Sequence, residues 1–500
     1  MRTSISHPLQ IAEVRAGPGY GLVGLTFCPG KQQPAAMSGG WSRDLDLDLD
    51  AVAAWNAAAV VTLLEPHELV RLKVQALGAM VRTRHMAWHH LPIRDVDVPG
   101  AGFEAVWAEV GPKLRARLRD GANVLVHCKG GLGRAGMIAA RLLIELGMES
   151  QEAIAAVRKV RPGAIETRSQ LDRVRSWGVV PEAAPDMDAE AVRDRAVGAL
   201  LGLALGDALG STRDGAPRDS TLPVAGLAGD GRYNLAAGQW TAPTTMAVAL
   251  ATSLIERRSF DEADFLERLA WWEADGEFSC TGTCIGMSAS VAGALARFRG
   301  MGELLADPAD RSDADGAALV RLPPVAIRYW QSGGADGPLR DVAVRQSRTT
   351  NADPASLATA TLFAELLGAA IAGSPRALLL REQPMGSEPA LGPLASGAWR
   401  HKHRHEIRSA GDPLSLLEAA LWCIARTGDF AEAVLLAANL SEAASATAAV
   451  TGQLAGALYG KAGIPKAWLS QLAWSELLES LALELTTPWG WYPEQSTAPA

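Results

Sequence analysis

The feature that most constrains the fold is a β-branched run that leads through a glycine-rich loop into an apolar helix. It reads NVLVHCKGGLGRAGMIAARLLIELG, from Asn123 to Gly147. Val and Leu dominate Asn123–His127, which predicts a buried strand, whereas the residues after Arg134 have the three- and four-residue apolar spacing of a helix. A strand that turns tightly into a helix is typical of α/β domains with a parallel sheet.

The loop contains two overlapping motifs. GLGRAG, starting at Gly131, fits G-x-G-x-x-G, the pattern of a dinucleotide-binding loop. That pattern also requires an acidic residue at the end of another strand, about 20 residues later. The segment found there, SQEAIAAVRKVRPG, has helical spacing instead. The dinucleotide interpretation therefore fails.

From Cys128 to Arg134, the same loop is suited to a phosphate group. Its glycines allow successive backbone N–H groups to turn inward beside a helix N-terminus, where anions bind. This positive field favours a thiolate at Cys128, and the planar guanidinium of Arg134 matches two phosphoryl oxygens. We predict a nucleophilic cysteine behind a bound phosphoryl group; an inert cysteine beside a structural turn is the alternative. The predicted phosphate-binding residues are Lys129, Gly130, Gly131, Leu132 and Gly133.

HCKGGLGR resembles the His-Cys-x5-Arg signature of the cysteine-based tyrosine and dual-specificity phosphatases, in particular the branch of cyclin-dependent-kinase-associated phosphatases. The similarity runs from about Gly21 to Trp177 and includes GLTFCPGK, HLPIRDVDVP and RPGAIETRSQ. It implies the α/β phosphatase fold, with Cys128 as nucleophile, Arg134 as phosphate clamp and no cofactor.

The resemblance also implies a general acid on a loop that precedes the cysteine. Asp95, in LPIRDVDVP, matches the family position, and Asp97 is the competing choice; a turn-capping aspartate is the structural alternative. Glu166, Thr167 and Gln170 match a segment that can place the hydrolytic water, or they are polar residues of a helix surface.

One residue departs from the family pattern. The family has Ser or Thr directly after the arginine, where its hydroxyl stabilises the departing thiolate, and this chain has Ala135. We expect a functional enzyme whose second step, hydrolysis of the phosphocysteine, is slow.

Composition changes at Val179–Asp194, which is rich in Pro, Ala and acidic residues and has no periodic apolar face. Strand-like and helix-like segments alternate before it, whereas the chain after it is almost entirely helical, with glycines where helices touch or end. A length of 500 residues also favours two domains. We predict a phosphatase-like domain over 1–180, a linker over 181–193, an all-α domain over 194–485 and a tail over 486–500.

The helical part resembles the ADP-ribosylglycohydrolase family from Arg195 to about Leu485. Matching segments are GALLGLALGDALG, GQWT, TGTC, RTTNADP, LEAALWC and TAAVTGQLAGALYG. The resemblance implies an all-helical orthogonal bundle around two magnesium ions.

Most magnesium ligands of that family are missing. Its Thr-Asp-Asp-Thr motif is TAPT here, with Ala242 and Pro243 in place of two carboxylates. Its second motif is SEAASA, with Ala443, Ser445 and Ala446 at the Asp, Asp and Thr positions. Because Mg²⁺ binds through carboxylates and water, we predict no metal and a catalytically inactive domain used for binding or regulation.

Gly286 occupies a further Asp position, and the remaining Thr241, Thr244 and Glu442 cannot hold two divalent ions. Asp214 lies near the position of a substrate-contacting Glu. Recognition of ADP-ribose or an ADP-ribosylated protein therefore stays open, beside a purely structural role.

The formal charge of −8 argues against nucleic-acid or acidic-membrane binding. We find no apolar core of signal-peptide length at the start of the sequence, and we predict that no later run is long enough to span a bilayer. Five scattered cysteines do not suit a disulfide framework, so we expect the protein to be located in a reducing cytoplasm. Cys280 and Cys284 form a C-x3-C pair, which we interpret as buried structural thiols rather than zinc ligands.

RDLDLDLDAV, from Arg43 to Val52, could suggest a cation site. We interpret it as a helix N-terminus capped by Asp48 or Asp50.

Three functions remain open. The leading one is phosphoester hydrolysis through a cysteinyl phosphate, on a phosphoprotein or a small phosphoester. The others are an ADP-ribosylglycohydrolase with an atypical metal site and a non-enzymatic binding protein.

Overall fold

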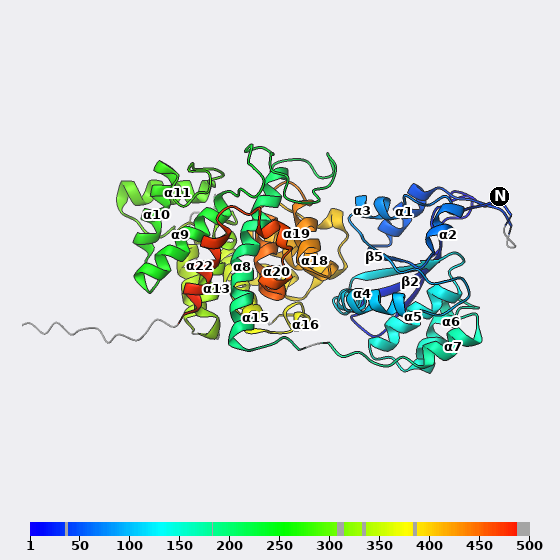
Figure 1. The fold of residues 1–500 in the computed structure, drawn as a ribbon. Coiled ribbons are helices and arrows are strands. Elements are labelled where there is room, and N and C mark those ends of the chain that lie inside the picture. The colour runs from blue at the N-terminus through cyan, green and yellow to red at the C-terminus, as the bar shows by residue number, and fades with distance from the viewer. Residues whose placement is uncertain (36–38, 183, 308–314, 333–336, 384–387, 488–500) are drawn as a thin grey trace, which may run out of the picture.

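The computed structural model describes residues 1–35, 39–182, 184–307, 315–332, 337–383 and 388–487. Its N-terminal part is a five-stranded sheet with helices on both faces (Figure 1). Strands β2, β7, β5 and β6 are parallel, as expected, whereas β1 adds an antiparallel edge. In spatial order the strands are β1 (Ala12–Arg15), β2 (Leu22–Phe27), β7 (Asn123–Cys128), β5 (Ala57–Thr62) and β6 (Ala87–His90). A separate hairpin pairs β3 (Gln32–Gln33) with β4 (Trp41–Ser42).

The central strand β7 contributes to a core on each face of the sheet. Val124 and Val126 belong to the cluster under α4, α5, α6 and α7, whereas Leu125 belongs to the cluster under α1 and α3. This alternation follows from the two-residue period of a strand, and it explains why β7 is apolar from Val124 to Val126 on both faces. The helices of this part are α1 (Leu45–Ala54), α2 (Pro66–Arg71), α3 (Leu77–Thr83), α4 (Ala101–Arg119), α5 (Gly133–Glu145), α6 (Ser150–Val160) and α7 (Arg168–Arg175).

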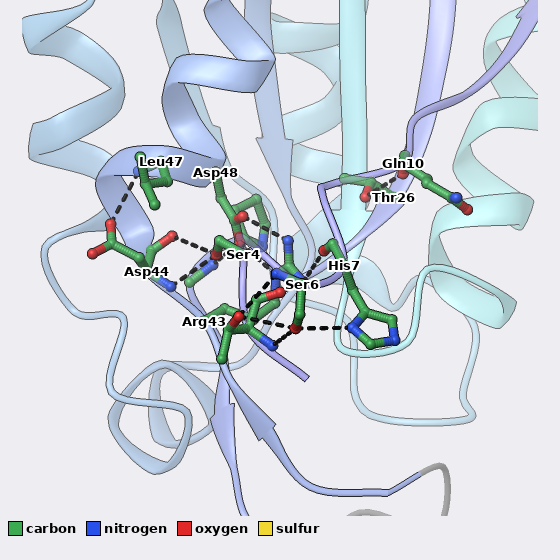
Figure 2. A network of polar contacts seen from close by, with 12 residues as sticks. Ser4, Ser6, His7, Gln10, Thr26, Arg43, Asp44, Leu47 and Asp48 are labelled. Carbon is green, nitrogen blue, oxygen red and sulfur yellow. Dashed lines mark hydrogen bonds and ion pairs between the residues drawn. The ribbon is translucent and has the colours of Figure 1, made fainter. Parts of the chain in front are cut away.

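A buried ion pair ties the first residues of the chain to the sheet (Figure 2). Arg43 and Asp48 are 2% and 1% exposed, and two bonds of 2.7 Å join them. Arg43 also donates to the carbonyl of His7, and Asp48 accepts the N–H of Gly30 at 2.8 Å. The pair therefore fixes the loop that follows β2.

The cap of α1 differs from the sequence prediction of Asp48 or Asp50. Asp44 is the N-cap, and its side chain accepts the N–H of Leu47 at 3.0 Å. The helix begins one turn earlier than the apolar pattern suggested, because Asp48 is used by Arg43 and Asp50 pairs with Arg84 on the surface.

Across the described residues, helices are the regular elements of the C-terminal part, and irregular segments and one isolated β-bridge connect them (Figure 1). Its α-helices are α8 (Ala189–Gly210), α9 (Ala242–Arg257), α10 (Glu262–Asp275), α11 (Ala289–Met301), α12 (Ala317–Val320), α13 (Pro323–Tyr329), α14 (Pro338–Arg348), α15 (Pro354–Ala372), α16 (Arg376–Leu379), α17 (Gly392–Ala395), α18 (Pro413–Arg426), α19 (Phe430–Ala438), α20 (Ala444–Tyr459), α21 (Lys466–Leu469) and α22 (Ser475–Thr486). Together they form the all-α bundle that the sequence predicted.

Close contact between α8 and α20 organises this bundle. Four glycines at a spacing of four line one face of α8: Gly198, Gly202, Gly206 and Gly210. A Cβ atom at any of them would lie 2.0–2.3 Å from a backbone oxygen of α20. Only glycine permits this backbone approach, so the glycines mark where the two helices touch.

Helix α8 begins at Ala189, inside the segment 181–193 that composition suggested as a linker. The side chain of Asp188 accepts the N–H of Ala191 at 2.8 Å and starts the helix before its apolar residues begin. At the other end, α22 stops at Thr486. The predicted tail beyond residue 487 lies outside the described residues.

One prediction about apolar segments is wrong. Within the described ranges, α15 is long and apolar enough, by length and composition alone, to cross a bilayer. However, 56% of its apolar window is buried inside the protein, where Phe363, Leu367 and Ile371 join the core. A buried core helix meets the same criterion.

Ion pairs join the two parts of the chain. Lys113 of α4 lies 2.6 Å from Asp429, and Asp120, at the end of α4, lies 2.7 Å from Arg376. Arg426 also donates to the carbonyl of Ala57 at 2.8 Å. The α4 side of the phosphatase-like part therefore lies against α18 and its neighbours.

We predict that Asp48→Asn destabilises the chain by about 3–5 kcal/mol, because it leaves the buried Arg43 cation without its counter-charge. Denaturant unfolding of the whole chain measures this change. Asp50→Asn is the matched control, since its side chain is 63% exposed and its surface pair should contribute less than about 1 kcal/mol. Equal losses in both variants would contradict the prediction.

Candidate functional site

The predicted cysteine lies at the carboxyl end of the central strand. Cys128 is the last residue of β7 and is 3% exposed, and α5 begins five residues later at Gly133. Because β2 and β5 flank β7 in parallel, three strand ends surround the loop. Such an edge is where ligands bind in open α/β sheets.

Four successive carbonyls of the loop accept hydrogen bonds from outside it. These carbonyls belong to Lys129, Gly130, Gly131 and Leu132. Lys31 Nζ donates to the first at 3.4 Å, Arg161 donates to the second and third at 3.1 and 3.0 Å, and the N–H of Gly136 donates to the fourth at 2.9 Å. A trans peptide directs its N–H opposite to its C=O, so the N–H groups of residues 130–133 point into the loop.

One of these inward N–H groups meets the cysteine directly. The N–H of Gly131 donates to Cys128 Sγ at 3.2 Å. Gly131 has a φ of +71°, and a Cβ there would lie 2.5 Å from the backbone of Thr26. Glycine is therefore required both for the left-handed turn and for the close approach to β2.

Arg134 lies where the loop enters α5 and is 2% exposed. Two bonds of 2.6 and 2.9 Å join its guanidinium to Glu68, and it donates to the carbonyl of Ile93 at 2.9 Å. Burial alone would raise the pKa of Glu68, but the hydrogen bonds from Arg134 and the Glu65 backbone, together with the charges of Arg134 and Lys129, hold the pKa below its usual value. The carboxylate thus holds the guanidinium plane in one orientation.

Sequence reasoning missed Glu68. The residue follows β5 in the segment EPHEL and forms a capping box with Glu65 at the start of α2. A glutamate at that capping position was the available sequence signal. Its partnership with Arg134, 66 residues away, is visible only in the folded chain.

Of the two candidate acids, the structure brings Asp95 to the loop. Asp95 Oδ1 lies 3.0 Å from Arg134, and Oδ2 lies 3.9 Å from Lys129 Nζ at the rim. Its side chain is 53% exposed, so solvent and ligand can reach it. The side chain of Asp97 instead accepts the N–H of Val98.

The segment after α6 lies beside the start of α5. A Cβ at Gly133 would lie 2.3 Å from the carboxylate of Glu166 and 2.9 Å from the amide of Gln170. Gln170 is fully buried and accepts the N–H of Glu166, whereas Thr167 is the N-cap of α7. Glu166 and Gln170 are therefore next to the loop, and Thr167 has a structural contact.

Lys31 is a second residue that sequence reasoning did not select. It is 5% exposed, and its ammonium lies 4.8 and 4.2 Å from the ring centres of Phe27 and Trp41. Burial lowers its pKa to about 8, although nearby thiols oppose this. His127 contributes no charge at neutral pH, because burial lowers its pKa to about 3.

In the helical domain, the retained threonines are bound to a protein carboxylate. Asp207 is fully buried and accepts the N–H and the hydroxyl of both Thr241 and Thr244 at 2.6–3.1 Å. Burial raises the pKa of Asp207 to about 6, although these donors lower it. The N–H and hydroxyl donors of Thr241 and Thr244 are therefore already used within the protein.

The other altered positions gather around Asp214 and Tyr233. Asp214 accepts the N–H and hydroxyl of Ser445 at 3.2 and 3.0 Å and the hydroxyl of Tyr233 at 3.3 Å. A Cβ at Gly286 would lie 3.5 Å from the Tyr233 hydroxyl and 3.7 Å from the Ala242 methyl.

This donor set does not fit a pair of magnesium ions. Across the described ranges, no three His, Cys, Asp or Glu side chains gather as a metal site would require. Glu442 is exposed, and methyl groups stand at positions 242 and 443. Hard divalent ions need several carboxylate oxygens, which these side chains do not supply.

The C-x3-C pair is less buried than expected. Cys280 and Cys284 are both half-buried, and the sulfur of Cys280 accepts the N–H of Trp240 at 3.4 Å. Burial raises the pKa of Cys280 to about 11. The loop between α10 and α11 is irregular, and it leaves these thiols at the edge of the core.

Two family models match the chain. The model described as ADP-ribosylglycohydrolase matches residues 188–494. The model described as Swiss Army Knife protein, DSP-PTPase phosphatase domain, matches residues 33–174. The two resemblances and the two-part architecture expected from the sequence are confirmed.

Individual relatives agree with this division. ADP-ribosylarginine hydrolase Tri1 of Pseudomonas putida (strain GB-1) is 37% identical over 304 residues, which are 59% of this chain and 79% of the relative. Cyclin-dependent kinase inhibitor 3 of Rattus norvegicus is 30% identical over 167 residues, which are 33% of this chain and 74% of the relative. A solved structure described as an ADP-ribosylglycohydrolase-related protein complex is 34% identical, covers 59% of this chain and 98% of its own, and has a TM-score of 0.52.

Proposed function

Because this chain belongs to the ADP-ribosylglycohydrolase family through residues 188–494 and carries a DSP-PTPase phosphatase domain over residues 33–174, we propose that it hydrolyses a phosphoester in its N-terminal domain. The observation that carries this proposal is the loop from Cys128 to Arg134. Its inward N–H groups, the sulfur and the guanidinium converge at one strand end. A phosphoprotein is the proposed substrate, in a reducing, cytoplasmic location where the thiol stays reactive.

In the first step, the thiolate of Cys128 attacks phosphorus and the bond to the leaving oxygen breaks. Arg134 and the N–H groups of residues 130–133 bind the three equatorial oxygens as charge redistributes. Asp95 protonates the leaving oxygen. In the free enzyme, Asp95 contacts Arg134 at 3.0 Å, and a bound phosphoryl group would replace that contact.

In the second step, water attacks the phosphorus of the phosphocysteine and the sulfur leaves as thiolate. Glu166 is exposed beside the start of α5, where its carboxylate can orient that water, and the buried Gln170 holds the segment by accepting the N–H of Glu166. Ala135 is fully buried in the first turn of α5 and offers no hydroxyl to the departing sulfur. We therefore expect phosphocysteine to accumulate during turnover.

We propose that the helical domain binds or regulates rather than catalyses. Its support is the Asp207 network, which uses the donors of Thr241 and Thr244 internally. ADP-ribose or an ADP-ribosylated protein is the proposed ligand, because the domain keeps the family fold. The competing function is glycohydrolysis at an atypical metal site.

The central test is turnover of an aryl phosphate by the purified whole chain. We expect hydrolysis by the wild type and none by Cys128→Ser, because serine is a far poorer nucleophile and leaving group at this position. Cys28→Ser is the matched control. The backbone N–H of Cys28 contacts the loop at the carbonyl of Lys129, but its thiol donates to the carbonyl of Pro29. Activity that survives in Cys128→Ser would refute the proposed function.

The roles of Asp95 and Asp97 can be distinguished with substrates whose leaving groups differ in basicity. We expect Asp95→Asn to reduce kcat/KM roughly 100-fold or more on an alkyl phosphate, which needs a proton donor, and less on an aryl phosphate. Asp97→Asn should leave both rates close to those of the wild type. The assignment is wrong if the two variants behave alike.

For the helical domain, we expect that Mg²⁺ does not shift the thermal unfolding midpoint of the chain. We also expect no release of ADP-ribose from ADP-ribosylarginine, with or without Mg²⁺. Four carboxylates of the family site are replaced, so no divalent ion should be held. The Pseudomonas putida relative serves as positive control. Magnesium-dependent release by this chain would favour the competing function.

A further inference from the structure

Arg161 is a charged residue beside the phosphate loop that the reaction above does not use. It is the first residue after α6 and is half-buried. Its Nη2 donates to the carbonyl of Gly130 at 3.1 Å, and its Nε donates to the carbonyl of Gly131 at 3.0 Å. Both contacts lie on the outer side of the loop, so Arg161 does not face the bound phosphoryl group.

A single peptide group connects Arg161 with the nucleophile. The carbonyl of Gly130 accepts from the guanidinium, and the N–H of the same peptide, which belongs to Gly131, donates to Cys128 Sγ at 3.2 Å. A charged donor on a carbonyl polarises the peptide and strengthens its N–H as a donor. The next peptide has the same arrangement, because Gly131 O accepts from Arg161 and the N–H of Leu132 points into the loop.

The charge of Arg161 is not neutralised by a salt bridge. Across the residues whose positions the structure gives, no carboxylate lies within 4 Å of its guanidinium. Burial lowers the pKa of Arg161, whereas the charge of Cys128 raises it. The arginine thus supplies a cation whose hydrogen bonds end on the loop.

We propose that Arg161 is a positioning residue that raises the thiolate fraction of Cys128 and the oxyanion affinity of the loop by polarising two of its peptide groups from behind. This inference rests on the proposed function, but its consequences can be read without turnover. Lys31 also donates to the loop, at the carbonyl of Lys129 at 3.4 Å, but burial lowers its pKa to about 8, so its charge is lost in mildly alkaline solution. Arg161 keeps its charge throughout that range.

Other charged and titratable groups also surround the sulfur, and they stay unchanged when Arg161 is replaced. They are Cys28 and Lys31 after β2, Glu68 of α2, Asp95 on the acid loop, His127 of β7, Lys129 and Arg134 of the loop, and Glu166 before α7.

The test compares Arg161→Gln, Arg161→Lys and Arg158→Gln in the whole chain. Arg158 is the matched control, because it also donates to two carbonyls, those of Ala164 and Ile165 at 3.1 Å, but none of the loop. The rate of iodoacetamide alkylation is measured against pH, and the rate of Cys128→Ser is subtracted to isolate Cys128. Tungstate binding is measured by calorimetry.

We expect Arg161→Gln to move the alkylation midpoint upward by about one pH unit and to weaken tungstate binding about tenfold. Arg161→Lys should fall between wild type and Arg161→Gln, because an ammonium keeps the charge but cannot reproduce the forked contact. Arg158→Gln should match the wild type. If Arg161→Gln fails to fold, Arg161→Lys provides the comparison with Arg158→Gln.

The inference would be overturned if the Arg161 variants had the same alkylation midpoint and the same tungstate affinity as the wild type. That outcome is distinct from failure of the proposed function, which would appear as phosphatase activity in Cys128→Ser. A loss of kcat/KM without a change in either loop measurement would also count against the inference, since a general structural defect would explain it.

Discussion

The outward orientation of four carbonyl groups, from Lys129 to Leu132, determines what the N-terminal domain can do. Each carbonyl has a donor outside the loop, so the N–H groups of residues 130–133 are left facing one point at the start of α5. That point is where a sulfur anion and a phosphoryl group can share the same donors. Glu68 fixes the plane of the Arg134 guanidinium at that point through two hydrogen bonds.

The helical domain also has a helix N-terminus whose donors converge on one point, but a protein carboxylate already occupies that point. The amides at the start of α9 and the hydroxyls of Thr241 and Thr244 also converge on a negative charge, but that charge is the carboxylate of Asp207 from α8. The N-terminus of α5 is available to an external anion, whereas the N-terminus of α9 is already occupied by the protein itself. This difference supports assigning catalysis to the first domain and binding or regulation to the second.

One set of contacts between the domains falls on α4, which also packs against the sheet that carries the loop. Lys113 and Asp120 pair with residues of the helical domain, while Trp107 and Leu114 of the same helix enter the phosphatase core. A ligand of the helical domain that changes these pairs would act on an element adjoining the sheet that carries the loop. The surface pairs between exposed groups contribute little energy, whereas removal of one partner of the buried Asp120–Arg376 pair would leave the other charge buried and unpaired.

The sequence by itself determined the local units of this protein: the strand, loop and helix from Asn123 to Glu145, the glycine-marked α8, and the missing carboxylates at positions 242, 243, 443 and 445. These follow from short-range spacing, because glycine conformations, apolar periodicity and residue chemistry are properties of neighbours in the chain. Tertiary structure decided the rest. Glu68, Lys31 and Arg161 reach the loop from separate segments, and only the folded chain shows that Asp95 contacts Arg134. The cap of α1 was mispredicted for the same reason: Asp48 is used by a buried arginine, and no local pattern specifies which distant charge a carboxylate will neutralise.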